Sequence, residues 1–262
     1  MSAIKLLTGT NILVTRPVHQ ADCLADGIRA MGGNPILFPV LEITDITDIR
    51  PLQELINHLD AFDLAIFVSP NAINKAMPLI LMNRALPPNL KIAVVGKSSA
   101  DTLKEYGIHK VIMPTQRFDS EALLDEAELQ QINNKRVVIF RGDDGRKLLG
   151  ETLIKRGAIL EYVTCYHRRK PFIDTGPLLT TWSQGKLNAV TITSSEGLHN
   201  LFDMIGEFGQ QLLKRTPLFT AHARIAQVAR DLGLDIVITT SAGDKGLLQG
   251  LLEYFQASKN QI

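Results

Sequence analysis

Small hydroxyl residues, glycines and cations follow most of the short apolar runs in this sequence. They are Thr15, Arg16, Ser69, Asn71, Gly96, Lys97, Ser98, Ser99, Arg141, Gly142, Thr193, Ser194, Ser195, Gly197 and Arg224. Most stand where a helix is expected to begin, and free backbone N–H groups and the helix dipole favour an anion there. Residues of these types are also ordinary N-caps and turn residues. The prediction of carboxylate or phosphate binding therefore depends on the whole set, repeated along the chain.

The apolar runs alternate with amphipathic segments. The expected strands are Asn11–Thr15, Pro35–Ile43, Leu64–Val68, Lys91–Val95, Lys110–Met113, Arg136–Phe140, Ile159–His167, Asn188–Thr193, Leu218–Thr220 and Ile236–Ile238. The expected helices are Ala21–Met31, Leu52–Leu59, Asn71–Met82, Ser98–Tyr106, Ser120–Gln131, Arg146–Arg156, Gly197–Ile205, Arg224–Leu232 and Lys245–Phe255. This alternation predicts an α/β fold with parallel sheets. Ligands of such sheets bind beyond the carboxyl ends of the strands, where the polar residues above are found.

An internal repeat divides the chain. The pairs Arg16 and Arg141, Gly32 and Gly157, and Ser69 and Ser194 are each separated by 125 residues. Each pair occupies the same place relative to an expected strand or helix, so the repeat predicts two similar α/β lobes.

Two further stretches, at 36–43 and 161–171, match at the same offset and are interpreted as interlobe linker strands. Lobe 1 is then discontinuous and comprises residues 1–35 and 172–262, while lobe 2 comprises 44–160. A cleft between lobes is a usual place for a ligand. Tyr166 and the basic residues that follow it are expected at the floor of that cleft.

Bulk properties exclude several classes of protein. With 262 residues and a net charge of +1, the chain has no general field that would attract nucleic acid or a membrane surface. Its two cysteines have no metal-ligand or disulfide spacing. The first residues contain too short an apolar run for a signal peptide, and no run approaches a membrane span. A cytoplasmic monomer is expected, and the absence of dinucleotide and phosphate-loop motifs predicts no cofactor.

Several short motifs occur in an order that resembles the uroporphyrinogen-III synthase family over nearly the whole chain. The motifs are Val14-Thr15-Arg16-Pro17, Ile66-Phe67-Val68-Ser69-Pro70-Asn71-Ala72-Ile73, Ala93-Val94-Val95-Gly96-Lys97, Arg141-Gly142, Gly145-Arg146, Cys165-Tyr166-His167-Arg168, Thr193-Ser194-Ser195-Glu196-Gly197, Arg224-Ile225-Ala226 and Gly233. The resemblance implies two flavodoxin-like lobes joined by a two-stranded linker, with Tyr166 as the active-site tyrosine.

The resemblance also implies a reaction. The linear tetrapyrrole hydroxymethylbilane would be cyclised to uroporphyrinogen III, with inversion of the last ring and loss of water, without metal or cofactor. Hydroxymethylbilane synthase would hand over the substrate transiently. In the mechanism that we expect, Tyr166 assists departure of the hydroxyl, and the last ring then forms a spiro intermediate. The phenol is a weak acid at neutral pH, so Tyr166 should help without being indispensable.

Two other functions fit the same residues. One is a non-catalytic, two-lobed intracellular protein that binds an anionic metabolite, and tight binding without turnover would favour it. The other is a flavodoxin-like enzyme that uses a nucleotide or a phosphate. A flavin or nucleotide retained through purification would favour that second alternative.

Overall fold

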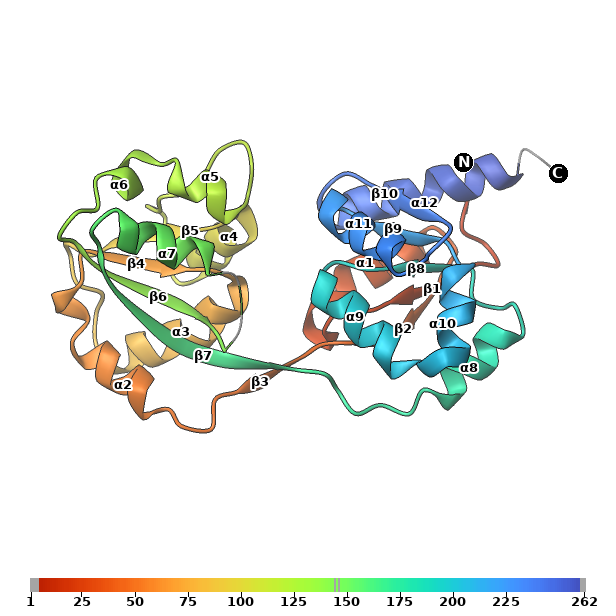
Figure 1. Ribbon diagram of the computed structural model, residues 1–262, viewed down its shortest axis with the longest axis horizontal. Helices are drawn as coiled ribbons and strands as arrows, with labels where there is room; N and C mark the ends of the chain where they lie inside the picture. Colours follow the sequence, from red (N-terminus) through yellow and green to blue (C-terminus); the bar gives the residue numbers. More distant parts are fainter. Residues whose placement is uncertain (1–4, 144, 146, 260–262) are drawn as a thin grey trace. The chain divides into compact units, whose positions relative to one another are not determined.

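The computed structural model describes residues 5–143, 145 and 147–259. The chain forms two compact units, one made of residues 1–42 and 169–262 and the other of residues 43–168. It passes from one unit to the other at Glu42–Ile43 and again at Arg168–Arg169. We call them unit 1 and unit 2 (Figure 1).

Unit 1 contains one five-stranded sheet. Its strands are β1 (Asn11–Val14), β2 (Asn34–Leu37), β8 (Ala189–Thr191), β9 (Leu218–Thr220) and β10 (Val237–Thr239), in the order β10-β9-β8-β1-β2 with parallel neighbours. Counted along the chain this is the order 2-1-3-4-5, which is that of flavodoxin-like folds.

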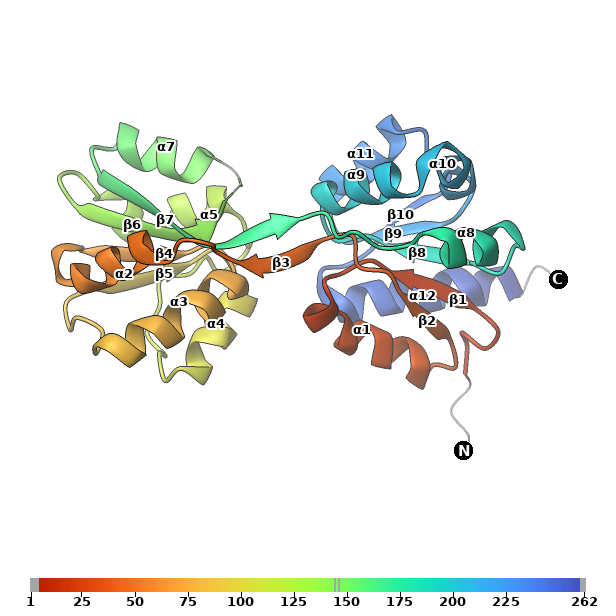
Figure 2. The same ribbon diagram turned by 90° about the horizontal axis from the view of Figure 1, so that it is seen from below.

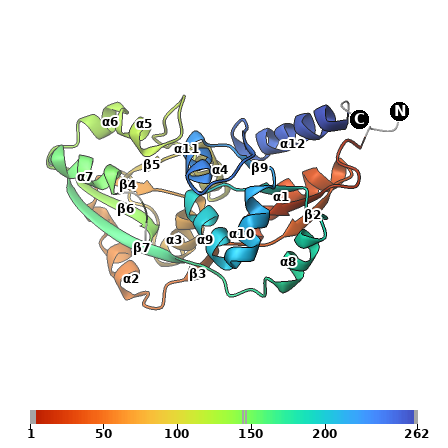
Figure 3. The same ribbon diagram turned by 45° about the vertical axis from the view of Figure 1, so that its right-hand side comes forward.

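The helices of unit 1 cover both faces of its sheet. They are α1 (Val18–Ala30), α8 (Gly176–Ser183), α9 (Ser195–Met204), α10 (Gly206–Lys214), α11 (Ala223–Asp231) and α12 (Gly243–Lys259). Residues of α1 and α12 pack on one face with Ile12 and Phe219. Residues of α8 to α11 pack on the other with Leu13 and Val190. In Figure 3, α1 and α12 lie together, as the contacts between them require.

Unit 2 repeats this plan from a different starting point. Its strands are β3 (Glu42–Asp45), β4 (Leu64–Phe67), β5 (Lys91–Val94), β6 (Arg136–Gly142) and β7 (Ile159–Arg169), in the order β3-β7-β6-β4-β5. If β6 is counted first, the order β7-β6-β4-β5 is again 2-1-3-4, and all of these neighbours are parallel. The strands β1 and β6, which start 125 residues apart, are therefore equivalent, as the repeat predicts. Both repeat glycines, Gly32 and Gly157, have positive φ values next to a helix end, a conformation that favours glycine.

The helices of unit 2 also form two layers. They are α2 (Arg50–Asn57), the 3₁₀ turn η1 (Leu59–Ala61), α3 (Pro70–Asn83), α4 (Lys97–Glu105), α5 (Ser120–Leu124), α6 (Ala127–Gln130) and α7 (Leu148–Lys155). The helices α2 to α4 pack with Phe67 and Phe140, whereas α5 to α7 pack with Ile66 and Ile139. Figure 2 shows α3 and α7 on opposite sides of the strands, and shows the arrows of β3 and β7 pointing in opposite directions.

Three expectations about elements are wrong. The segment expected as one strand at Pro35–Ile43 forms β2 and β3, because residues 38–41 leave the sheet and bury Phe38 and Val40 in the core of unit 1. The strand expected at Lys110–Met113 is reduced to a single bridge between Ile112 and Ala93. The helix expected at Ser120–Gln131 is two short helices, because Glu126 has an extended backbone.

Two helices, α8 and α10, were not predicted from the sequence. In α8, Pro177 lies in the first turn, and Leu178 and Trp182, four residues apart, face the core. Proline at a helix start and an apolar pair at that spacing are both helix signals. They could have identified this element.

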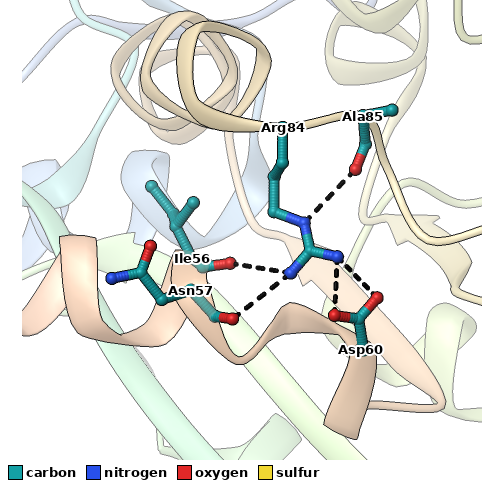
Figure 4. Close-up of polar contacts among 5 residues, drawn as sticks. All are labelled: Ile56, Asn57, Asp60, Arg84 and Ala85. Carbon is teal, nitrogen blue, oxygen red and sulfur yellow. Dashed lines mark hydrogen bonds and ion pairs between the residues drawn. The ribbon is translucent and has the colours of Figure 1, made fainter.

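Arg84 ties the helix pair α2 and α3 together (Figure 4). Its guanidinium donates to both carboxylate oxygens of Asp60, at 2.5 and 2.6 Å, and to the carbonyl oxygens of Ile56 and Asn57, at 3.4 and 3.3 Å. These carbonyls belong to the last turn of α2, where a cation is favoured by the helix dipole.

We expect Arg84→Met to lower the unfolding midpoint of unit 2 by roughly 2 to 4 °C. The substitution keeps much of the side-chain length but removes every hydrogen bond that Arg84 donates to the end of α2. This shift is measured by thermal unfolding, with the exposure of the buried Cys165 thiol as the probe of unit 2. Arg84→Lys keeps the charge but not the fork of donors, so its unfolding midpoint should lie between those of the wild type and Arg84→Met. An unchanged midpoint for Arg84→Met would contradict the role given to Arg84.

The same contact predicts a dependence on pH. Hydrogen bonds from Arg84 hold the pKa of Asp60 below its ordinary value of 3.8. Because the folded-state pKa is lower than that of the unfolded chain, this contribution to stability is fully present above about pH 4 and is lost as the pH falls through the folded-state value. The difference between wild type and Arg84→Met should therefore be larger at pH 7 than at about pH 2. If the two proteins differed in unfolding midpoint by the same amount at both pH values, the ionised carboxylate of Asp60 would contribute nothing to the stability.

Candidate active site

The carboxyl ends of β4, β5, β6 and β7 meet at one edge of the unit 2 sheet, because these strands are parallel neighbours. The predicted site residues of unit 2 follow these strands or lie on them. They are Ser69 and Asn71 after β4, Gly96, Lys97, Ser98 and Ser99 after β5, Arg141 and Gly142 on β6, and Tyr166 on β7. The structure therefore brings these residues to one edge, as the order of elements predicts.

Ser69 is the N-cap of α3. Its backbone is extended, and its Oγ accepts a hydrogen bond from the N–H of Ala72 at 3.2 Å, while Pro70 occupies the first turn. Gly96 is the corresponding residue at the start of α4 and has no side chain to use as a cap. Lys97 and Ser98 are exposed there, whereas Ser99 is only 2% exposed. The side chain of Ser99 therefore cannot meet a ligand in this conformation.

Tyr166 reaches Ser69 through an irregularity in the sheet. The pairing of β6 with β7 shifts between Arg141 and Gly142, so that Thr164 pairs with Arg141 but Tyr166 pairs with Gly142. This β-bulge places Cys165 and Tyr166 in the same core cluster, although adjacent strand residues normally point to opposite faces. The phenol is 1% exposed, and its hydroxyl lies 3.0 Å from Oγ of Ser69.

Gly142 provides the space for the ring. A Cβ at this position would lie 2.8 Å from Cε2 and 2.9 Å from Cζ of Tyr166. The neighbouring Arg141 donates from Nε to the carbonyl oxygen of Gly142 at 3.2 Å, and its guanidinium lies 5.2 Å from the centre of the Tyr162 ring.

A histidine–aspartate pair at the same edge was not predicted from the sequence. Nδ1 of His167 lies 2.8 Å from Oδ2 of Asp143, and Oδ1 of Asp143 accepts from the backbone N–H of Arg168 at 3.0 Å. The two residues are 24 positions apart and meet because β6 and β7 are neighbours. With regular pairing Asp143 would lie opposite Tyr166, so the β-bulge is what brings it to His167.

In unit 1, the predicted site residues follow β1, β8 and β9, which are also parallel neighbours. Thr15 is 3% exposed, and its hydroxyl donates to the carbonyl oxygen of Thr191 at 2.7 Å, so its role is to join two strands. Arg16 is half-buried and forms an ion pair with Asp244 in the first turn of α12. Arg224 is exposed in the first turn of α11.

The start of α9 carries the other group of predicted residues in unit 1. Thr193 precedes the helix, and Ser194 is its N-cap, accepting from the N–H of Gly197 at 2.9 Å. Gly197 is buried, and a Cβ there would lie 2.9 Å from Oγ of Ser194. The Oγ of Ser195 is buried and has no hydrogen-bond partner within the described part of the chain. This hydroxyl therefore keeps hydrogen-bonding capacity that no described residue uses.

The two cysteines differ in accessibility. Cys165, beside Tyr166, is 2% exposed, and burial raises the pKa of its thiol to about 12. Cys23 is exposed, and its pKa is raised chiefly by a hydrogen bond with Asp244.

One thiol per chain should therefore react with Ellman's reagent in the native state at about pH 8, and the second only after denaturation. Cys23→Ser should leave no native thiol that reacts. Two thiols reacting at similar rates in the native protein would contradict the burial of Cys165.

Two findings concern absence within residues 5–143, 145 and 147–259. No group of three or more His, Cys, Asp or Glu residues in this part of the chain could hold a metal ion. No helix there has both the length and the apolar composition that crossing a bilayer requires.

The fold and the strand ends define a class: a protein of two flavodoxin-like α/β units, each with hydroxyl residues, glycines and cations at the carboxyl edge of its sheet. The family model described as uroporphyrinogen-III synthase HemD matches residues 22–249. The chain belongs to the uroporphyrinogen-III synthase family.

Individual relatives agree with this assignment. The chain is 31% identical over 244 residues to uroporphyrinogen-III synthase of Escherichia coli (strain K12), covering 92% of this chain and 99% of that protein. It is 34% identical over 165 residues to the enzyme of Proteus mirabilis, covering 63% and 82% of the two chains. A mutant uroporphyrinogen III synthase of Thermus thermophilus has the same fold, with a TM-score of 0.66 at 15% identity, covering 96% of this chain and 99% of that one.

Proposed function

We propose that this chain is a uroporphyrinogen-III synthase, which cyclises hydroxymethylbilane to uroporphyrinogen III with inversion of the last pyrrole ring and loss of water. The observation that carries the proposal is its similarity to the Escherichia coli enzyme over nearly the full length of both chains. Hydroxymethylbilane can also close without enzyme to the type I isomer. The enzyme must therefore direct the closure as well as accelerate it.

The substrate is a flexible polyanion, and the helix N-termini at the two sheet edges are suited to its carboxylates. In unit 2 the first turn of α4 offers backbone N–H groups beside the exposed residues Lys97 and Ser98. In unit 1 the first turn of α9 offers backbone N–H groups beside the half-buried Thr193. Many modest hydrogen bonds of this kind restrict a flexible chain to one reactive shape.

The reaction begins when the C–O bond to the hydroxymethyl group of the first ring breaks. The oxygen leaves with the bonding electrons and takes up a proton, so that water departs and an azafulvene cation remains. The substituted α-carbon of the last ring attacks this cation and forms a spiro intermediate. The bond from the spiro carbon to the carbon that bridges it to the third ring then breaks and leaves a second azafulvene cation on the third ring. The unsubstituted α-carbon of the last ring attacks this cation and loses a proton, which closes the macrocycle in the inverted sense. The proton released in closure balances the one consumed at the start.

The hydroxyl pair of the half-buried Ser69 and the buried Tyr166 supports a site for the first step in unit 2, because a hydroxyl donor is what a departing oxygen requires. Arg141, Arg224, Thr193 and Asn71 stay predicted contacts of the substrate. The burial of Thr15 and Ser99 and the ion pair of Arg16 with Asp244 assign those three side chains to the framework of the site.

The monomeric state, the cytoplasmic location and the handover from hydroxymethylbilane synthase remain predictions from the sequence. Size-exclusion chromatography with light scattering tests the first of them. A mass of one chain at micromolar concentration is expected.

An isomer assay tests the proposed function. Hydroxymethylbilane is generated in place by its own synthase, the purified chain is added without cofactor, and the products are oxidised and separated as uroporphyrins I and III. Predominant type III is expected. Type I alone, from protein that is shown to be folded, would overturn the proposal and favour a protein that binds an anionic metabolite without turnover.

A further inference from the structure

The Tyr166 hydroxyl is enclosed by the core of unit 2. The residue is 1% exposed and belongs to the cluster formed by β4, β6 and helices α2 to α4. The β-bulge turns the ring toward the core, and Gly142, which has no Cβ, leaves the space that the ring occupies. In this conformation the phenol cannot touch a substrate bound at the edge of the sheet, so any effect of Tyr166 on the reaction requires an intermediate group.

Ser69 is that group. Within residues 5–143, 145 and 147–259, the hydrogen-bond partner of the Tyr166 hydroxyl is Oγ of Ser69, at 3.0 Å. Either hydroxyl could donate at this distance, but a buried O–H without an acceptor is costly, so we assign the phenol as the donor and Oγ of Ser69 as the acceptor. Ser69 is half-buried and follows β4 at the edge of the sheet.

The hydrogen bonds that Ser69 already makes determine which of its groups is left for a ligand. A serine hydroxyl has two acceptor lone pairs and one donor. The N–H of Ala72 occupies one lone pair, at 3.2 Å, and the O–H of Tyr166 occupies the other. The remaining function of Ser69 is its own O–H, which can only donate, and the two bonds it accepts hold it in one orientation.

We infer that Tyr166 is a positioning residue and that Ser69 donates the hydrogen bond to the substrate. This inference depends on the proposed function for the identity of the substrate. The acceptor is an oxygen, which is either the departing hydroxyl of the first ring or a side-chain carboxylate. Tyr166 contributes by directing the Ser69 O–H toward that oxygen, without contacting it.

A double-mutant cycle tests the inference. Ser69→Ala should reduce the rate of type III formation about tenfold, and Tyr166→Phe should reduce it by no more than that. Because Tyr166 acts only through Ser69, adding Tyr166→Phe to Ser69→Ala should cause little further loss. A fall in kcat identifies the departing hydroxyl as the acceptor, and a rise in KM identifies a carboxylate. Tyr106→Phe, the same change at the C-cap of α4 and away from the strand ends, should leave the rate unchanged.

Two results would overturn the inference. Losses that multiply, to about a hundredfold in the double variant, would mean that Tyr166 acts independently of Ser69. A loss in Tyr166→Phe well beyond that in Ser69→Ala would mean that the phenol itself reaches the substrate. Urea unfolding of each variant shows whether the substitution has lowered the stability of the protein. A second control is kinetic, because a merely structural role would leave the split between kcat and KM unaltered.

The proposed function and this inference can fail separately. Type III product from the wild type establishes the function whatever the cycle shows. If the wild type gave only type I, the same four proteins would be compared by their affinity for uroporphyrin III. Coupling between Ser69 and Tyr166 in binding would then support the positioning role, and independent effects would overturn it.

Discussion

Replacing Gly142 by alanine is expected to lower the stability of unit 2 by about 1 to 3 kcal/mol and the rate of type III formation by up to about tenfold. The added Cβ would lie 2.8 Å from the Tyr166 ring, closer than real contacts allow, and the buried ring has little room to retreat. The ring and its hydroxyl must therefore move away from Ser69. Because Tyr166 acts through Ser69, the loss of rate should not exceed that of Ser69→Ala, and the loss of stability follows from overpacking the core.

The experiment compares the rate, the isomer ratio and the urea midpoint of Gly142→Ala with those of Gly176→Ala. Gly176 is exposed at the start of α8 in unit 1, and a Cβ there would meet only the end of the Asp174 side chain, at 3.2 Å. This control variant should behave as the wild type. If Gly142→Ala kept the full rate and midpoint, the packing of Tyr166 against Gly142 would not determine the position of the phenol.

The repeat shows what the sequence alone could predict. The matching glycines and arginines mark equivalent strand and helix ends, and the structure confirms that β1 and β6 begin 125 residues apart at equivalent positions in their sheets. These features are local: a β-branched run, a helix and a glycine with positive φ occur in fixed order. Their prediction needs no knowledge of which segments meet in space.

Contacts between distant segments could not be predicted in the same way. Ser69 and Tyr166 are 97 residues apart, and their contact depends on a bulge that shifts the pairing of β7 by one residue. A regular strand would have placed Cys165 and Tyr166 on opposite faces, so the alternation rule gives the wrong face for one of them. The ion pair between Arg16 and Asp244 likewise depends on where α12 packs.

The failures in element prediction have a related cause. The segment at Lys110–Met113 has the composition of a strand, but only Ile112 forms a bridge to the neighbouring strand. The apolar spacing within Ser120–Gln131 fits one helix, yet the chain turns at Glu126 so that Leu123 and Leu129 both enter the core. In both cases tertiary packing overrides a local preference.

The second large effect is expected from Phe140→Ala, which should destabilise unit 2 by about 3 to 5 kcal/mol. Phe140 and Phe67 are paired in register on β6 and β4, both are at most 1% exposed, and their rings stack with centroids 4.5 Å apart. Truncation leaves a cavity in the middle of the core and removes the aromatic pair. A loss of this size is a large fraction of the stability of a typical domain.

The chain supplies a separate probe for each unit. Trp182, the single tryptophan, is 3% exposed in the core of unit 1, and Cys165 is buried in unit 2. In urea, Phe140→Ala should expose the Cys165 thiol at a much lower concentration and leave the Trp182 fluorescence transition unchanged. Phe219→Ala, a matched truncation in the core of unit 1, should do the reverse. If both probes moved together in both variants, the two cores would unfold as one cooperative unit, and the stability of each could not be changed alone.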